Sequence, residues 1–296
     1  MEFLPVLDPL DKPKEGIWYS LIPRGSAPGV SVGHTCSFIP SADGGKGRIL
    51  IIGGANPSGS FIQSHTINLD NHEWDIPEWE GLDSRYEHCS FVPESDPQSL
   101  WVFGGAQQSG NRNCIQNLQL TASFTWSQPE TQGRHPPARH GHIIVAVGFK
   151  IYIHGGMAGD KFHNDMYSLD TRSMKWEKVQ TKGDIPPGVA AHSAVVLGKN
   201  VYIFGGMTAD GASNSMYRFN TDKSRWVLMK FEGDMPPNRL DHSMCLLPWK
   251  VCSEGNGSEE HASSPAASET INLAFVFGGM DTQGVIHNDC VVTVVT

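Results

Sequence analysis

Five apolar segments of this chain end in the same way, with two consecutive glycines. The first is Ile49-Leu50-Ile51-Ile52-Gly53-Gly54, and its equivalents end at Gly105, Gly156, Gly206 and Gly279. The first glycines of successive pairs are 51, 51, 50 and 73 residues apart. A nearly constant period of about 50 residues is typical of proteins built from repeated units of secondary structure. The chain is therefore predicted to contain five similar units.

Two further markers accompany the glycine pairs. A histidine precedes each pair, and these histidines are His34, His88, His142, His192 and His242. A tryptophan follows each of the first four pairs, and the intervals between markers suit four short strands per unit. The residues expected to maintain the repeat are the glycines and tryptophans Gly53, Gly54, Gly104, Gly105, Gly155, Gly156, Gly205, Gly206, Gly278, Gly279, Trp18, Trp74, Trp126, Trp176 and Trp226.

This order of markers resembles the kelch repeat, whose units form the four-stranded blades of β-propellers. The second strand of each unit is apolar at successive positions, so both of its faces must be covered. Blades packed side by side provide that cover, and the glycines allow close approach of the backbone. The resemblance implies an all-β fold, namely a β-propeller of five four-stranded blades.

The N-terminal segment is predicted to complete the last blade. The fifth repeat has a final strand near residues 291–295, but no tryptophan follows it. Trp18 lies 16 residues before His34, and the same spacing separates Trp126 from His142. We therefore expect one propeller over residues 1–296, closed by both chain ends, with repeats near residues 30–80, 84–130, 138–180, 188–230 and 238–296 plus 15–22.

The fifth repeat is longer because of an insertion. Residues 252–270 are rich in Ser, Glu, Gly, Ala and Pro. Such a segment cannot bury enough apolar surface to offset the entropy of ordering it. It is predicted to be a disordered insertion in the last blade.

Composition limits the compartment and the ligands. The net charge of −9 argues against nucleic acid as the main partner. No apolar run reaches the ~18 residues of a membrane span, and residues 1–11 lack the features of a secretory signal. The six cysteines form no Cys-x-x-Cys pair, which favours buried thiols in a reducing compartment. We expect a cytoplasmic protein.

Catalytic and metal chemistry have little support. His140 and His142 share one face of a predicted strand, with His135 and His154 nearby, but no carboxylate or cysteine completes a ligand set. One packing role explains all five repeated histidines. Nucleophile elbows and phosphate-binding loops are absent from the sequence. We predict no catalytic residue, no metal and no cofactor, and a metal-dependent kelch enzyme is the least favoured alternative.

A protein-binding face is the better-supported prediction. The loops that enter each first strand and those that follow the glycine pairs share one end of the ring, and rigid loops on a scaffold suit recognition. Asp160, Asp210 and Asp281 provide acidic counterparts to basic residues there. The candidate partner-binding residues are Arg24, Arg85, Arg112, Arg134, Arg139 and Arg239. For Arg85, Arg139 and Arg239, hydrogen bonds to loop carbonyls are an equal alternative.

Several segments are similar to those of a narrower group, the kelch proteins that act as effectors of a late-endosomal Rab GTPase. The matching segments are residues 53–57, 109–114, 201–208, 239–245 and 290–295. The resemblance implies a non-catalytic adaptor that binds the GTP-bound Rab and supports transport from late endosomes to the trans-Golgi network. It implies peripheral association with endosomal membranes, through partners alone.

One departure from that pattern concerns the number of repeats. Kelch proteins of this type carry six, and five are counted here. The spacing around residues 115–126 indicates that one repeat is deleted in register. A second functional hypothesis is the substrate-recognition kelch module of a ubiquitin ligase.

Overall fold

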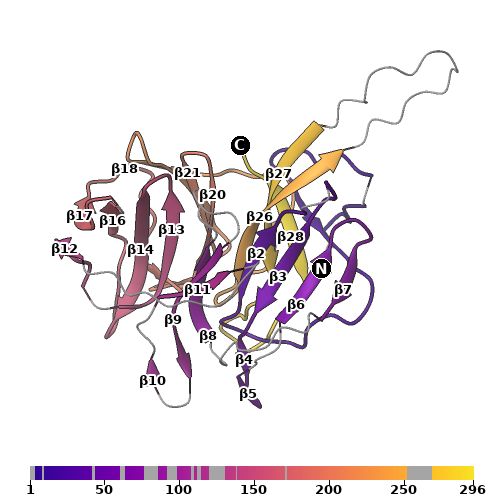
Figure 1. Ribbon diagram of the computed structural model, residues 1–296, viewed down its shortest axis with the longest axis horizontal. Coiled ribbons are helices and arrows are strands. Elements are labelled where there is room, and N and C mark those ends of the chain that lie inside the picture. Colours follow the sequence, from indigo (N-terminus) through magenta and orange to yellow (C-terminus); the bar gives the residue numbers. More distant parts are fainter. Residues whose placement is uncertain are drawn as a thin grey trace, which may run out of the picture.

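A computed structural model describes most of the chain (Figure 1). The described residues are 4–8, 10–41, 44–60, 64–76, 86–91, 99–107, 110–111, 115–119, 131–137, 139–170, 172–251 and 269–296. Their regular elements are all β-strands, so the all-β prediction is confirmed. Trp126 and most of the predicted insertion, residues 252–268, lie outside the described residues, whereas Glu269 and Thr270 already belong to a strand.

Five sheets contain most of the strands. They are numbered I to V in chain order, and the strand that the N-terminal segment adds to sheet V is not counted in this order. Sheet I consists of β2 (Thr35–Ile39), β3 (Arg48–Ile52), β6 (Ser64–Asn68) and β7 (Glu73–Asp75). Sheet II contains β8 (Tyr86–Phe91), β9 (Ser99–Gln107) and β11 (Ile115–Gln119). Each of these strands is antiparallel to its neighbours.

Sheets III and IV have four antiparallel strands and one short parallel edge strand each. Sheet III contains β13 (His140–Val147), β14 (Lys150–Ala158), β16 (Met166–Asp170) and β17 (Lys175–Val179), with β12 (Gln132–Gly133) beside β17. Sheet IV contains β20 (Ser193–Leu197), β21 (Asn200–Phe204), β24 (Met216–Asn220) and β25 (Arg225–Leu228), with β18 (Lys182–Gly183) beside β25.

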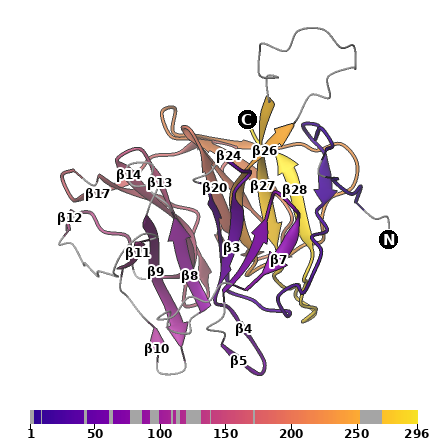
Figure 2. The ribbon, with the colours of Figure 1, turned by 45° about the vertical axis from the view of Figure 1, so that its right-hand side comes forward.

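Sheet V joins the two ends of the chain. Its order is β1 (Trp18–Ser20), β28 (Cys290–Val294), β27 (Glu269–Phe277) and β26 (Ser243–Val251). Trp18 pairs with Thr293 and Ser20 pairs with Val291, in antiparallel register. Figure 2 shows the indigo N-terminal strand beside the yellow β28. The expected pairing of the Trp18 segment with the last strand is therefore present.

Short hairpins follow the glycine pairs. They are formed by β4 (Ala55–Asn56) with β5 (Gly59–Ser60), by β10 (Gly110–Asn111) and β15 (Lys161–Phe162), which return onto β9 and β14, and by β22 (Met207–Thr208) with β23 (Gly211–Ala212). β19 (Val189–Ala190) pairs with β22. In Figure 1 the hairpins of sheets I and II project at the bottom of the view. We call this end of the molecule the hairpin end, and the opposite end the turn end.

The first strands of the five sheets lie next to one another in cyclic order. β2 contacts β8, β8 contacts β13, β13 contacts β20, β20 contacts β26, and β26 contacts β2. Backbone hydrogen bonds link residues at or just before the start of these strands. Gly33 donates to Asp241, Asp241 to Ala191, Ala191 to Gly141, and Glu87 to Gly33, over 2.7–3.1 Å. Each inner strand therefore has two inner strands as neighbours.

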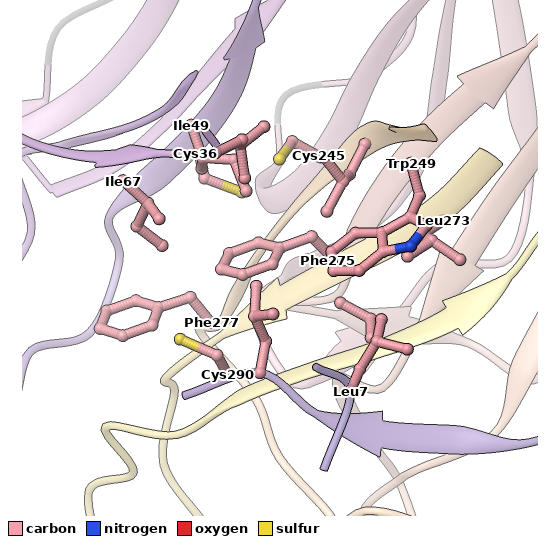
Figure 3. Close-up of a cluster of buried hydrophobic side chains, with 14 of the residues drawn as sticks. Leu7, Cys36, Ile49, Ile67, Cys245, Trp249, Leu273, Phe275, Phe277 and Cys290 are labelled. Carbon is pink, nitrogen blue, oxygen red and sulfur yellow. The ribbon is translucent and has the colours of Figure 1, made fainter. Parts of the chain in front are cut away.

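Hydrophobic clusters fill the spaces between adjacent sheets. The largest lies between sheets I and V and includes Ile49, Ile67, Phe275 and Trp249, together with Leu7 from the N-terminal segment (Figure 3). Similar clusters join sheets IV and V, sheets III and IV, and sheets I and II. In β3, β14, β21 and β27, apolar residues on both faces of the strand are thus buried, as their continuous apolar pattern requires.

In sheets III, IV and V, the residue just before the glycine pair packs against the neighbouring sheet. Phe204 in sheet IV packs against Trp18 and His242 of sheet V, with ring centroids 5.1 and 5.3 Å apart. His154 in sheet III packs in the same way against Trp226 and His192 of sheet IV. Phe277 does so against Trp74 and His34 of sheet I. The repeated tryptophans and histidines therefore act together, across the boundary between sheets.

Candidate partner-binding face

The glycine pairs turn the chain at the hairpin end. Gly205 and Gly206 both have positive φ, of 65° and 91°, a conformation that disfavours side chains. A Cβ on Gly205 would lie 2.6 Å from Cε1 of His242, and one on Gly206 would lie 2.7 Å from Cβ of His192. Glycine is therefore needed at both positions, for backbone conformation and for close approach.

Four of the repeated histidines, His34, His88, His192 and His242, are buried near the glycine pairs, and His142 is partly buried. His34 donates from Nε2 to the carbonyl of Phe277 at 3.0 Å. Burial lowers the pKa of His34 to about 4, with a smaller opposing effect from that hydrogen bond. Burial likewise lowers the pKa of His192 and of His242. Neutral, packed imidazoles at equivalent positions have a structural role. The described residues contain no group of three or more His, Cys, Asp or Glu placed to hold a metal ion.

Two of the candidate arginines are not available to a partner, which corrects their prediction as binding residues. Arg239 is fully buried, and its guanidinium group donates to Asp289 and to the carbonyl of Gly278 at 3.0 Å. The side chain of Arg139 is 2 % exposed and donates to Asp165 and to the carbonyl of Gly155. Both residues instead follow the alternative prediction, since each donates a hydrogen bond to a loop carbonyl. Each also forms an ion pair with an aspartate carboxylate.

The sequence contains a signal for these ion pairs that the predicted binding residues did not take into account. His-Asn-Asp precedes β16 at residues 163–165 and β28 at residues 287–289. Sheet IV has Val189 in place of the arginine and Ser215 in place of the aspartate. The arginine and the aspartate are thus present together in sheets III and V, and both are replaced in sheet IV.

The exposed arginines lie elsewhere. Arg24 donates to the carbonyl of Asn71, in the turn between β6 and β7, and forms an ion pair with Glu73 at 3.2 Å. Arg134 is exposed beside the outer strand of sheet III, where its backbone N–H donates to Trp176. The predicted set of six arginines therefore does not form one face. Arg85 and Arg112 lie outside the described residues.

A groove opens at the hairpin end of sheet IV. Its volume is about 260 Å³, and it lies between the β22–β23 hairpin and the loops that enter sheets IV and V. Pro186, Pro187 and Tyr217 contribute apolar or aromatic surface, while Asp210 and Asn238 contribute polar groups. A hydrogen bond connects the two sides of the groove, because the side-chain amide of Asn214 donates to the carbonyl of Pro236 at 2.9 Å. A rigid groove of mixed polarity suits a protein ligand.

A second hollow lies on the axis between the sheets. It has a volume of about 90 Å³, and equivalent segments of all five inner strands line it. Asp241 lies there with φ of 53°, as does Glu87 with φ of 54°. Burial, and then the charge of Glu87, raise the pKa of Asp241 to about 7. The axis is too narrow for more than a few atoms, and the loops around it form a larger surface.

The repeat architecture defines the class of the protein. The family model of the KLHDC2/KLHL20/DRC7 kelch-repeats domain matches residues 33–256. The chain belongs to the kelch-repeat family.

No helix in the described part of the chain has the length and apolar character needed to span a bilayer.

Three whole-length relatives carry the same name. A Rab9 effector protein with kelch motifs from Danio rerio is 58 % identical over 360 residues, covering 100 % of both chains. Its namesake from Xenopus laevis is 50 % identical over 364 residues, with 99 % of this chain and 100 % of the relative covered. The one from Mus musculus is 41 % identical over 374 residues, with 100 % and 98 % covered. These alignments are longer than the 296 residues of this chain.

Proposed function

We propose that this chain is a non-catalytic adaptor that binds the GTP-bound form of a late-endosomal Rab GTPase. The observation that carries the proposal is the 58 % identity, over the full length of both chains, to a Rab9 effector protein with kelch motifs. In this role the protein supports vesicle transport from late endosomes to the trans-Golgi network. It resides in the cytoplasm and associates peripherally with endosomal membranes.

The scaffold for this role is a closed propeller of five blades. Sheets I to V are the blades, and the cyclic contacts of their first strands support closure of the ring. The pairing of β1 with β28 supports a last blade shared by the two chain ends. The blades correspond to residues 30–80, 84–130, 138–180, 188–230 and 238–296 plus 15–22, in a single domain over residues 1–296.

The missing repeat is part of the same proposal. The alignment to the Danio rerio relative spans 360 residues, so at least 64 of its positions have no counterpart among the 296 residues here. A gap of this size exceeds the period of 50 to 51 residues between neighbouring glycine pairs. We assign the gap to one repeat deleted near residues 115–126, together with shorter loops.

The hairpin end is the surface that we assign to the Rab. It combines the groove of sheet IV with the exposed acidic residues Asp160 and Asp210 at the tips of two hairpins. Carboxylates at the rim accelerate association with a basic partner surface, while the packed groove contributes affinity. The arginines Arg139 and Arg239 hold the underlying loops rather than touch the partner.

A pull-down with purified Rab9 tests the function directly. The full chain is expected to bind Rab9 loaded with a non-hydrolysable GTP analogue at least tenfold more tightly than the GDP-loaded form. Equal binding to both forms, or none to either, would refute the effector role. The double variant Asp160→Lys/Asp210→Lys is expected to weaken binding about tenfold, whereas Asp222→Lys at the turn end, also exposed, leaves it unchanged.

A further inference from the structure

The turn end of sheets III and IV forms one continuous surface. It consists of the turns that join β13 to β14, β16 to β17, β20 to β21, and β24 to β25. The two sheets meet there, since the rings of Tyr152 and Phe219 lie 6.4 Å apart and β13 contacts β20. This surface lies opposite the hairpins β4–β5 and β10 in Figure 1.

Basic side chains dominate this surface. The exposed members, which we call the basic turn surface, are Lys150, Arg172, Lys175, Lys182, Lys199, Lys223 and Arg225. Among the described residues of this surface only three are acidic, namely Asp170 at the end of β16, Glu177 in β17 and Asp222 in the turn between β24 and β25. The chain as a whole carries a net charge of −9. Positive charge is therefore concentrated here against the overall balance.

Much of this charge is not neutralised by ion pairs. Arg172 lies 3.5 Å from Asp170, Lys175 lies 3.8 Å from Glu177, and Lys199 pairs with Asp222. Within the described part of the chain, the remaining four basic residues, Lys150, Lys182, Lys223 and Arg225, have no ion-pair partner. Like charges held together in this way create a positive potential that attracts an extended anionic surface.

An aromatic side chain stands within the basic turn surface. Phe149, at the tip of the β13–β14 turn, is 57 % exposed, and the guanidinium carbon of Arg172 lies 4.9 Å from the centre of its ring. A phenyl ring at a turn tip brings no advantage in binding an acidic peptide, which has no apolar or stacking group to meet it. At a bilayer surface the ring leaves water while the adjacent cations meet headgroup phosphates. The combination therefore favours a membrane over a dissolved acidic partner.

We propose that the basic turn surface binds anionic membranes, with its lysines and arginines at phospholipid headgroups and Phe149 inserted at the interface. This differs from the prediction that the protein reaches membranes through partners alone. The contact leaves the hairpin end facing away from the bilayer. The proposal does not depend on the Rab, because it uses the opposite end of the molecule.

Co-sedimentation of the full chain with vesicles tests the proposal. Binding is expected to phosphatidylcholine vesicles that contain phosphatidylserine, and to weaken as salt is raised, while pure phosphatidylcholine vesicles bind far less. The variant Lys150→Ala/Lys182→Ala/Lys223→Ala is expected to lower the partition coefficient about a hundredfold, at about fivefold per charge. Phe149→Ser is expected to lower it severalfold while leaving the salt dependence in place.

A matched control removes three exposed lysines from outside this surface. The variant Lys14→Ala/Lys161→Ala/Lys230→Ala has the same net charge as the test variant and is expected to bind vesicles about as well as the unaltered chain. Equal loss in both variants would overturn the proposal, as would equal binding to neutral and anionic vesicles. Binding to soluble poly-glutamate without binding to vesicles would assign the surface to an acidic protein instead. Since no Rab is present, failure here leaves the effector role untouched.

Discussion

The fully buried guanidinium group of Arg239 forms a two-point ion pair with Asp289, with Nη1–Oδ1 and Nη2–Oδ2 distances of 2.8 and 3.0 Å. Burial by itself would raise the pKa of Asp289, but the hydrogen bond and the charge of Arg239 lower it below its usual range. The pair joins the loop that enters sheet V to the start of β28. It therefore stabilises the end of the sheet that carries the predicted binding loops.

Removing one partner of this pair is expected to be costly. Asp289→Asn leaves a buried cation without a counter-charge, so the free energy of unfolding should fall by about 3 kcal/mol. Urea denaturation followed by tryptophan fluorescence measures the change. The control Lys199→Ala breaks an exposed ion pair with Asp222 and should have little effect. Equal effects in the two variants would contradict the structural role of Arg239.

Asp241 is expected to make stability depend on pH. Its pKa is raised to about 7 in the folded chain, above the usual value of 3.8, so folding favours the neutral carboxyl group. Its contribution to stability is therefore complete below about pH 4 and is lost as the pH rises through 7. Asp241→Asn removes this loss, and asparagine tolerates the positive φ. The variant should match the unaltered chain near pH 4.

The difference should grow to roughly 4 kcal/mol in favour of the variant at pH 8, where Asp241 is charged in the unaltered chain, because the pKa shift of about three units corresponds to about 1.4 kcal/mol per unit. Thermal unfolding of both proteins across this range provides the measurement. A difference that is constant with pH, or that grows toward acid, would show that Asp241 is not held neutral by its surroundings.

The N-terminal strand is expected to be integral to the fold. Trp18 is 1 % exposed, and its ring packs against Phe204 and Phe231, with centroids 5.1 and 5.7 Å away. Trp18→Ala should therefore cost about 3–5 kcal/mol through the lost burial and the cavity that remains. Ile22→Ala, at a nearby residue that is 66 % exposed, serves as the control. A cost below about 1 kcal/mol for Trp18→Ala would mean that β1 is peripheral.

A comparison of Gly205 with Gly198 distinguishes two costs of adding a side chain. One is the steric clash of the new Cβ, and the other is the positive φ. Both have positive φ, of 65° and 56°. An added Cβ would lie 2.8 Å from the carbonyl oxygen of Arg239 at Gly205, whereas at Gly198 it meets no atom within 4 Å. Gly198→Ala should cost about 1 kcal/mol and Gly205→Ala more than about 3 kcal/mol, measured by urea denaturation. Similar costs would contradict the tight contact between sheets.

Much of the fold could be predicted because the repeats report local structure. The apolar run and the glycine pair mark the second strand and its end, and the 16-residue spacing placed Trp18 beside the last strand. The packing of Trp18 on Phe204 was harder to foresee. That contact joins residues from different repeats, and periodicity within one repeat does not describe it.

The burial of two candidate arginines was not predicted, because residue type alone does not reveal burial. Arg139 and Arg239 stand at loop positions, which suggested exposure, yet their aspartate partners lie 26 and 50 residues later in the chain. The shared occurrence of the arginine and of His-Asn-Asp in two repeats is a sequence signal for these pairs, but only the placed loops show that the charged groups meet. Arg24, by contrast, lies in a loop and is exposed, but at the turn end.

The assignment of the hairpin end to the Rab is tested most directly by hydrogen–deuterium exchange of the full chain, alone and with GTP-loaded Rab9. If the Rab binds there, exchange is expected to slow in residues 157–163 and 207–213 and in the loops at residues 184–189 and 234–240. No change is expected in the turns at residues 148–150, 198–200 and 221–225. Slower exchange confined to those turns, or none in the hairpins, would contradict the assignment.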